Sequence, residues 1–284
     1  MKSSVILRKV VIMIAVSSLS ITGCKKDESK NNNDHRSGQD QSSAQVLFND
    51  VLHQMDKVYN ESSQSGFKVG NTKSLSECVS VSITPEGTDI WPKTVVLDYG
   101  SSNCLCTDGK NRRGKITGFF SGPYREEGAV ITITLQDYFE NDVFVEGTER
   151  ITNQGRNNAQ YGRNLVYKVE VVAARFTNDE GSATWNSTST HEWIEGESTE
   201  GLEWQDDVYM VDGIAYGTDI KGKSYSGKTT KAMRCALDCQ WIQSGSVEIT
   251  SDENITFSVD YGSGNCDNKA TINYKGLIIP FSMR

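Results

Sequence analysis

The stretch from His191 to Tyr209 concentrates the side chains of this sequence that are best suited to act on a bound molecule. It reads HEWIEGESTEGLEWQDDVY, so acidic residues are interleaved with two tryptophans. A pair of carboxylates at a set separation can hydrolyse a glycosidic bond, and an exposed tryptophan ring offers a flat face to a sugar. The pattern is equally typical of an ordinary hairpin with acids on its wet face and tryptophans in the core. The candidate binding surface comprises Trp193, Glu195, Trp204, Asp206 and Asp207.

No recognisable catalytic motif accompanies these acids. The three histidines are His35, His53 and His191, and a Ser–His–Asp triad would have to use His191. Its setting, STSTHEWIEG, alternates as a polar edge strand does. The sequence contains no HExxH motif, no Gly-x-Ser-x-Gly elbow and no glycine-rich phosphate loop. We predict a non-catalytic protein that recognises a glycan, a peptide or a protein; the alternative is a polysaccharide hydrolase that uses acids within residues 192–207.

The N-terminus predicts export. Residues 1–23 combine a basic start, MKSSVILRK, with the apolar run VVIMIAVSSLSI, which is the layout of a secretory signal peptide. The run is shorter than the about 20 residues that a membrane-spanning helix needs. The sequence ITGC, ending at Cys24, resembles the lipobox of bacterial lipoproteins. The resemblance implies cleavage before Cys24 and attachment of a lipid to its sulfur.

The residues behind Cys24 predict a tether at the outer membrane. KKDE at residues 25–28 resembles the signal that sends Bacteroidota-type lipoproteins to the cell surface. Residues 24–43 are rich in Asn, Ser and Gln, so we expect a lipidated, disordered tether there. The formal net charge of −8 argues against nucleic acid as a partner. The expected partner is the membrane, through the lipid, and the expected location is the outer membrane with the body facing the cell surface.

The other six cysteines predict disulfides, because an exported chain with an even number of cysteines usually pairs them. We expect Cys239 to pair with Cys266, and Cys78 to pair with Cys104 or Cys106. Cys235 would then pair with whichever of Cys104 and Cys106 remains. Zinc bound through Cys104-x-Cys106 or through Cys235 and Cys239 is the alternative, although these spacings are unusual for zinc sites.

A loop sequence that occurs twice in the chain predicts two copies of one structural unit. VVLDYGSSNC ends at Cys104 and FSVDYGSGNC ends at Cys266, and the preceding runs SVSIT and SVEIT also correspond. Residues 78–121 and 239–283 are therefore expected to form similar three-stranded units. Asp98 and Asp260 offer oxygen ligands that would suit calcium. Asp-x-Gly at the end of a strand is also ordinary turn chemistry, so we expect turns and no bound cofactor.

One helix and many strands must position these groups. Apolar residues at three- and four-residue spacing predict an amphipathic helix over residues 44–60, with one face packed on a sheet. Beyond it, apolar and polar residues alternate, as in CVSVSIT and VITITLQ. YMVDGIAY predicts a tight hairpin that turns at Asp212 and Gly213. The expected fold is all-β: an antiparallel meander of about a dozen strands, curved into a barrel-like or sandwich form, within a single domain of residues 44–284.

The body also resembles a family of exported Bacteroidota-type lipoproteins. The resemblance rests on CVSVSIT, DYGSSNC, CTDGKNRRGKI, SGPY, LDCQW and DYGSGNCDN, and it covers about residues 78–284. It implies export and a β-rich body, and it implies no particular activity. A periplasmic carrier or chaperone is a further alternative, which predicts an apolar cavity inside the rolled sheet.

Overall fold

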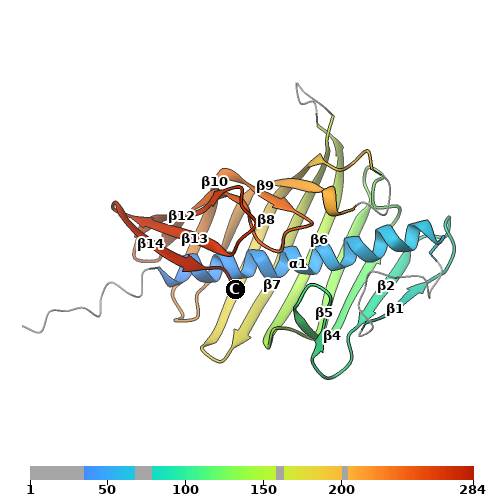
Figure 1. Ribbon diagram of the computed structural model, residues 1–284, viewed down its shortest axis with the longest axis horizontal. Coiled ribbons are helices and arrows are strands. Elements are labelled where there is room, and N and C mark those ends of the chain that lie inside the picture. Colours follow the sequence, from blue (N-terminus) through green and yellow to red (C-terminus); the bar gives the residue numbers. More distant parts are fainter. Residues whose placement is uncertain (1–34, 68–78, 158–162, 200–203) are drawn as a thin grey trace, which may run out of the picture.

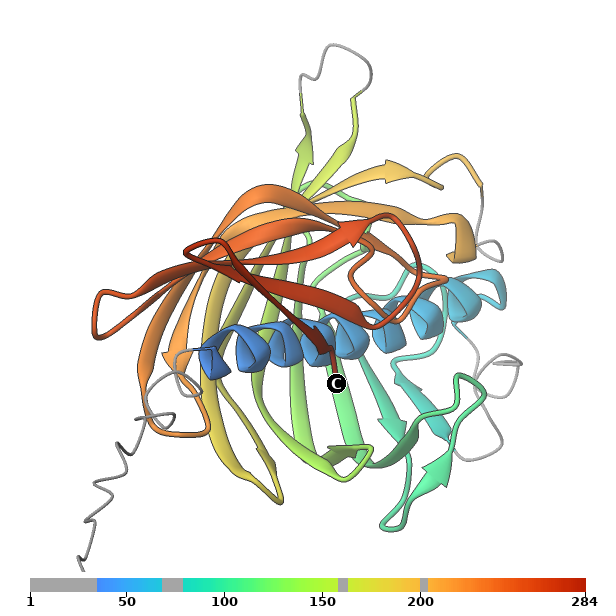
Figure 2. The same ribbon diagram turned by 60° about the vertical axis from the view of Figure 1, so that its left-hand side comes forward.

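A strongly curved antiparallel sheet wraps around one long helix in the computed structural model of the chain (Figure 1, Figure 2). The structure describes residues 35–67, 79–157, 163–199 and 204–284. The elements are α1 (Arg36–Gln64), β1 (Ser80–Thr84), β2 (Lys93–Asp98), β3 (Cys104–Leu105), β4 (Asn111–Phe120), β5 (Val130–Glu140), β6 (Val143–Arg156), β7 (Leu165–Asn178), β8 (Gly181–Glu195), the 3₁₀ turn η1 (Trp204–Asp206), β9 (Val208–Thr218), β10 (Ser224–Ala236), β11 (Ser244–Ser251), β12 (Thr256–Ser263), β13 (Lys269–Tyr274) and β14 (Leu277–Ser282).

The sheet is a meander whose strands follow chain order from β1 to β14, with the short β3 paired to β4 beside this path. All its pairings are antiparallel. β1 and β14 form the two edges and do not pair with each other, so the sheet is open. The predicted all-β meander with a helix before it is confirmed, in a curved form that does not close.

Irregularities in strand pairing allow the sheet to curl. The register between β4 and β5 shifts between Arg113 and Lys115, where Gly114 has a φ of 86°. A Cβ at Gly114 would lie 2.0 Å from the carbonyl oxygen of Asp137, so only glycine allows this close approach. Further shifts occur along β6, β7 and β10. Such bulges increase local twist and bend the strands, which lets one sheet surround the helix.

Apolar side chains of α1 fill the inside of the curve. Val51, Met55 and Val58 recur at three- and four-residue spacing and are buried. The ring of Phe48 stacks on that of Trp185 in β8, with the centroids 5.5 Å apart. The helix therefore packs its apolar face on the concave side of the sheet, where a sandwich would place a second sheet. Within the described residues, no helix combines the length and the apolarity that crossing a membrane requires.

The polar side chains at the start of α1 are also buried, because the sheet curls over them (Figure 2). Asp40 Oδ2 accepts a hydrogen bond of 2.8 Å from the backbone nitrogen of Ile220. The indole nitrogen of Trp185 donates to Gln41 Oε1, also at 2.8 Å. These bonds satisfy polar groups that would otherwise be costly to bury.

The helix consequently begins at Arg36, well before residue 44. The prediction of a disordered tether over residues 24–43 is therefore wrong for residues 36–43, which are helical and mostly buried. Their composition resembles that of a tether, but their polar groups find partners on β8 and on the loop between β9 and β10. Residues 24–34, with Cys24, lie outside the described residues.

The two similar units lie at opposite edges of the sheet. β1 pairs with β2 so that Ser80 faces Asp98, and β11 pairs with β12 so that Ser246 faces Asp260. The repeated sequence therefore forms two hairpins with one register, as expected. The units differ beyond their second strand, since β2 pairs directly with β4, whereas β12 is followed by both β13 and β14. The second unit thus has four strands, not three.

The tyrosine of each repeated loop holds the helix. Tyr99 and Tyr261 follow the aspartates of the two loops, and both are buried. The hydroxyl of Tyr99 donates to Gln54 Oε1 at 3.4 Å, and the hydroxyl of Tyr261 lies 3.0 Å from Ser42 Oγ. Each edge of the sheet is therefore bonded to a different part of α1.

The hairpin expected at Asp212 and Gly213 is absent, because β9 runs through both residues. They lie opposite Thr190 and Ser189 of β8. A Cβ at Gly213 would lie 2.5 Å from the carbonyl oxygen of Thr188. The glycine therefore permits close strand packing in the middle of the sheet and does not mark a turn.

Candidate functional site

A cavity of about 410 Å³ lies beside α1, where residues of both repeated units meet. Its walls come from α1, from residues 99–112 of the first unit, from η1, from the loop that follows β10, and from Cys266 of the second unit. Volumes of roughly 300–1,000 Å³ are typical of sites for small ligands. We call it the helix pocket and treat it as the candidate site.

Four side chains of α1 face the helix pocket: Asp50, His53, Gln54 and Lys57. Their three- and four-residue spacing places them on one face of the helix. This is the polar face of the predicted amphipathic helix. It faces a cavity and not bulk solvent, because η1, the loop after β10 and residues of the two repeated units surround it.

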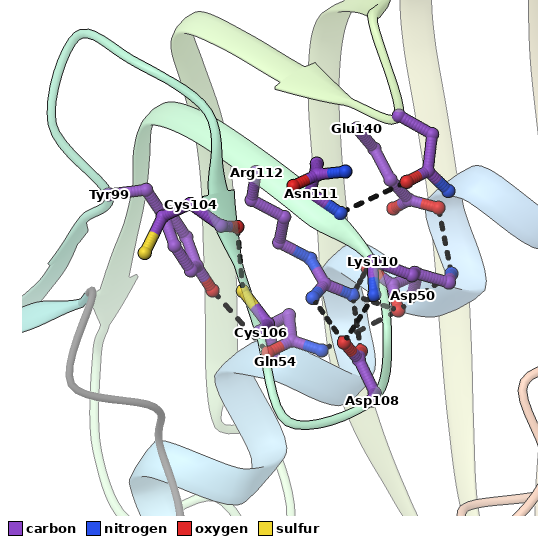
Figure 3. Close-up of polar contacts among 11 residues, drawn as sticks. Asp50, Gln54, Tyr99, Cys104, Cys106, Asp108, Lys110, Asn111, Arg112 and Glu140 are labelled. Atoms are coloured by element: carbon purple, nitrogen blue, oxygen red, sulfur yellow. Dashed lines mark hydrogen bonds and ion pairs between the residues drawn. The ribbon is translucent and has the colours of Figure 1, made fainter.

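Arg112 of β4 connects this helix face to the wall of the pocket (Figure 3). Its Nη2 donates to both carboxylate oxygens of Asp50, at 2.8 Å each, and to Asp108 Oδ2 at 2.7 Å. Burial alone would raise the pKa of Asp50, but the charges of Arg112 and Lys110 hold that pKa well below its ordinary value. Burial of Asp108 is likewise outweighed by Arg112, so its pKa is lowered. Both carboxylates are ionised at neutral pH.

Lys110 and Glu140 complete the ion cluster around Asp50 and Arg112 (Figure 3). Lys110 Nζ lies 3.1 Å from Asp50 Oδ1 and 2.7 Å from Glu140 Oε1. Burial, and then the negative charge of Asp50, raise the pKa of Glu140 to about 8. With Glu140 protonated, the two cations Lys110 and Arg112 balance two ionised aspartates. A balanced cluster is the form in which buried charges are tolerated.

Lys57 is the cation of the pocket that pairs with no carboxylate in the described part of the chain. Its Nζ lies 4.6 Å from the centroid of the Trp204 ring. Burial lowers the pKa of Lys57. Burial, and then the charge of Lys57, lower the pKa of His53 to about 3, so His53 is neutral at pH 7. The pocket thus has one aromatic wall, a neutral imidazole and one ammonium that pairs with no carboxylate of the described residues.

Two residues of the candidate binding surface are buried instead of exposed. Trp193 lies in the core of the sheet, where its ring stacks on Tyr209 with the centroids 5.6 Å apart. Asp207 is also buried, and burial raises its pKa to about 7. The prediction that these two side chains belong to a binding surface is wrong. The alternating pattern of β8 turns Trp193 inward, and Asp207 is buried directly before β9 begins.

The other three members of the candidate binding surface do not converge on one site. Glu195 is paired with Arg234 at 3.2 Å on the outside of the sheet. The hydroxyl of Thr199 donates to Asp206 at 3.0 Å. Trp204 alone lines the helix pocket, so the structure brings it together with residues of α1 that are distant in sequence.

His191 is not an edge-strand residue. It lies in β8, which pairs with β7 and β9 on its two sides, and it is buried. Its Nε2 is 3.1 Å from Ser189 Oγ, and burial lowers its pKa to about 4. His191 is therefore a neutral core histidine.

The disulfide between Cys239 and Cys266 is present, as predicted. Cys106 and Cys235 are free thiols, so the predicted bridge from Cys235 to Cys104 or Cys106 is wrong. Cys235 faces the helix, where Asn49 Nδ2 donates to its sulfur at 3.5 Å. That orientation takes it away from the loop of the first unit.

The remaining predicted bridge involves Cys78, which lies outside the described residues. Cys104 is disulfide-bonded, and Cys106 is not. Cys106 lines the helix pocket as a half-buried thiol. The pairing of Cys78 stays a prediction.

The aspartates of the repeated loops form turns. Asp98 Oδ1 accepts a hydrogen bond of 2.9 Å from Gly100 N, and Asp260 Oδ1 accepts one of 2.7 Å from Gly262 N. Asp98 Oδ2 also lies 2.8 Å from Lys115 Nζ. In the described ranges, no group of three or more His, Cys, Asp or Glu side chains is placed to hold a metal ion.

A second cavity, of about 600 Å³, lies near the start of α1. Its two arginines, Arg36 and Arg284, both pair with Glu180, at 2.6 and 3.1 Å. Its cations are thus neutralised by the protein itself, in contrast to Lys57 in the helix pocket.

Sequence reasoning missed Asp50, Lys57 and Arg112 as site residues. The polar spacing of Asp50, His53 and Lys57 within the predicted helix was the available signal. Nothing in the sequence indicates that Arg112 and Trp204 lie beside that face.

Comparisons of the chain with protein-family models, with curated proteins and with solved structures found no match. Function must therefore be inferred from the helix pocket itself.

Proposed function

We propose that this chain is an exported, lipid-anchored protein that binds a saccharide in the helix pocket. The observation that carries the proposal is the combination, in one cavity, of the Trp204 ring with hydrogen-bonding side chains such as Gln54, Gln205 and His53. A sugar presents a C–H face that packs on an indole ring and a rim of hydroxyl groups that pair with amides and imidazoles. The candidate surface predicted from sequence thus contributes Trp204 and is otherwise replaced by α1.

The charge state of the pocket favours binding over hydrolysis. A glycosidase needs one carboxyl group that carries a proton to the leaving oxygen. Of the carboxylates that line the pocket, Asp50 and Asp108 both accept hydrogen bonds from Arg112 and have lowered pKa values. Neither is suited to donate a proton at neutral pH. Glu140, whose pKa is raised to about 8, does not line the pocket.

The packing of α1 favours a polar ligand over an apolar cargo. A carrier of lipids or of unfolded chains would need an apolar cavity between the helix and the sheet. Among the described residues, the two spaces found there each measure about 10 Å³, which is no more than one water molecule occupies. An apolar cargo would have to displace the helix.

The proposed location rests on the sequence around Cys24. A lipid on Cys24 would hold the body at the membrane, and residues 25–28 would direct it to the cell surface. Protease added to intact cells should then digest the body while a periplasmic control protein survives. Protection until the outer membrane is opened would place the protein in the periplasm and would leave periplasmic glycans as its ligands.

Calorimetric titration of the purified Cys24→Ser protein with neutral and acidic mono- and oligosaccharides tests the proposed binding. We expect at least one saccharide to bind, and Trp204→Ala to weaken it at least about tenfold, the equivalent of about 1.4 kcal/mol. Trp241→Ala is the matched control, because Trp241 lines the second cavity. Absence of binding by every saccharide, or equal binding by the two variants, would contradict the proposal.

A further inference from the structure

The charges of the helix pocket are balanced except at two positions. Arg112 is paired with Asp50 and Asp108, so none of these three has an unmet charge. Lys57 and Asp238 form no ion pair with any described residue. Asp238 lies exposed on the loop after β10, where water and salt screen its charge. Lys57 is half-buried in the wall, so its ammonium is less screened.

The surroundings of Lys57 suit a ligand that brings a negative charge. Its Nζ stands over the Trp204 ring, 4.6 Å from the centroid, and His53 and Gln54 lie one helical turn away on the same face. Burial has removed part of the water around the ammonium, which lowers the pKa of Lys57. An anion beside it would restore the lost stabilisation through a charge-assisted hydrogen bond.

We infer that the ligand of the helix pocket is an acidic saccharide, with a sugar ring against Trp204 and its carboxylate bonded to Lys57. The inference rests on the proposed saccharide binding and specifies its chemical class. A neutral sugar would leave the ammonium unpaired in a partly dehydrated wall. A uronic acid carries its carboxylate directly on the sugar ring. A sugar packed on the Trp204 indole would therefore bring this carboxylate near Lys57 Nζ, which lies over the same indole.

Two pairs of ligands that differ only at this carbon test the inference: galacturonic acid with galactose, and glucuronic acid with glucose. Affinities are measured by calorimetry at low salt on the Cys24→Ser protein. We expect one of the acids to bind at least about tenfold more tightly than its neutral partner, as a hydrogen bond to a charged group allows. Raising the salt concentration should weaken the binding of the acid and leave the affinity for the neutral sugar unchanged.

Substitutions of the two unpaired residues give the decisive comparison. Lys57→Met should abolish the preference for the acid, Lys57→Arg should keep it, and Asp238→Asn should leave it equal or larger. Circular dichroism and the melting temperature of each variant show whether it has folded. A preference for the acid that survives Lys57→Met would overturn the assignment of Lys57.

The results also separate the two proposals. If the neutral and the acidic sugar of each pair bind with equal affinity, the inference of an acidic ligand fails and the proposed saccharide binding stands. If no saccharide of either kind binds, both fail.

Discussion

At the scale of single residues, Arg112 bonds the helix α1 to the loop that forms one wall of the pocket. It is fully buried and bonds two carboxylates, one on α1 and one on the loop before β4. Replacing a buried pair with apolar residues can be harmless, but removing one partner leaves a charge buried and uncompensated. The Arg112 guanidinium therefore links α1 directly to the loop before β4.

Arg112→Met should lower the free energy of unfolding by about 3–5 kcal/mol, because Asp108 loses its partner and Lys110 is left to balance Asp50 alone. Urea unfolding followed by circular dichroism measures the loss. Lys115→Met, on the same strand, is the matched control, since its pair with Asp98 is partly exposed and should contribute less than about 1 kcal/mol. Equal losses in the two variants would contradict the role given to Arg112.

Asp56 gives a residue-scale prediction about pH. It is buried in α1, and burial followed by the charge of Asp207 raises its pKa to about 8. Between its ordinary pKa of 3.8 and about 8, the folded state holds a proton that the unfolded state releases. Stability contributed at this site is therefore complete at low pH and is lost as the pH rises through that window.

Asp56→Asn should remove this dependence, because the amide has no proton to lose. The stability of the variant relative to the unmodified protein should rise from pH 5 to pH 8, by up to about 1.4 kcal/mol per pH unit. Urea unfolding at several pH values checks this, with the exposed Asp238→Asn as the control. A constant difference between Asp56→Asn and the unmodified protein would show that Asp56 is ionised in the folded state.

At the scale of elements, the repeated loop explains how an open sheet stays wrapped around a helix. The hairpin of each repeated unit delivers one buried tyrosine to α1, Tyr99 at Gln54 and Tyr261 at Ser42. The aspartate before each tyrosine closes its own turn. The repeated loop sequence therefore encodes two tyrosine contacts that hold α1, which we call the clamps. The polar side chains of α1 that line the pocket lie beside the first clamp, at Gln54.

Tyr261→Phe should destabilise the protein by about 0.5–1.5 kcal/mol, the usual net contribution of one hydrogen bond. Combining it with Ser42→Ala should give less than the sum of the two single losses, since both remove the same bond. Tyr216→Phe is the control, because Tyr216 is exposed on the outside of the sheet. Strict additivity of Tyr261→Phe and Ser42→Ala would contradict the clamp.

Gly38 tests whether the start of α1 is packed. Glycine in an exposed helix is less stable than alanine by roughly 0.5–1 kcal/mol, so Gly38→Ala would stabilise a free helix. Here a Cβ would lie 2.8 Å from Phe257 Cε2 and 3.0 Å from Val259 Cγ2. We expect Gly38→Ala to lower the melting temperature, with the exposed Gln64→Ala as the control. A higher melting temperature for Gly38→Ala would mean that residues 36–43 do not pack against β12.

The element scale also shows what sequence could and could not provide. Alternation of apolar and polar residues was sufficient to predict the strands, and the spacing of Val51, Met55 and Val58 was sufficient to predict the helix. The predictions for residues 36–43 and for the Asp212-Gly213 pair are wrong, because polar composition and turn-forming residues do not reveal the partners that the curled sheet supplies. Those partners, such as Ile220 and Trp185, are distant in sequence, and no local pattern indicates them.

At the scale of the whole molecule, the two repeated units, η1 and the loop after β10 meet at the helix and create the pocket. The predicted acidic stretch contributes Trp204 to the pocket. Asp50, His53 and Lys57 come from α1, and strands β1 to β8 lie between α1 and Trp204 in the sequence. The site could not be predicted from sequence, since it depends on how far the sheet curls. Ligand binding where the two repeated units meet is the central claim.

Protection of Cys106 from alkylation tests this claim most directly. Cys106 lines the helix pocket, whereas burial raises the pKa of the Cys235 thiol to about 12 and makes it unreactive. Iodoacetamide labelling of Cys106 is followed by mass spectrometry, with Cys106→Ser as the control. At galacturonic acid concentrations ten times the measured dissociation constant, only about one molecule in ten has an empty pocket. The rate of Cys106 labelling should then fall about tenfold; an unchanged rate at that saturation would mean that the sugar binds elsewhere on the molecule.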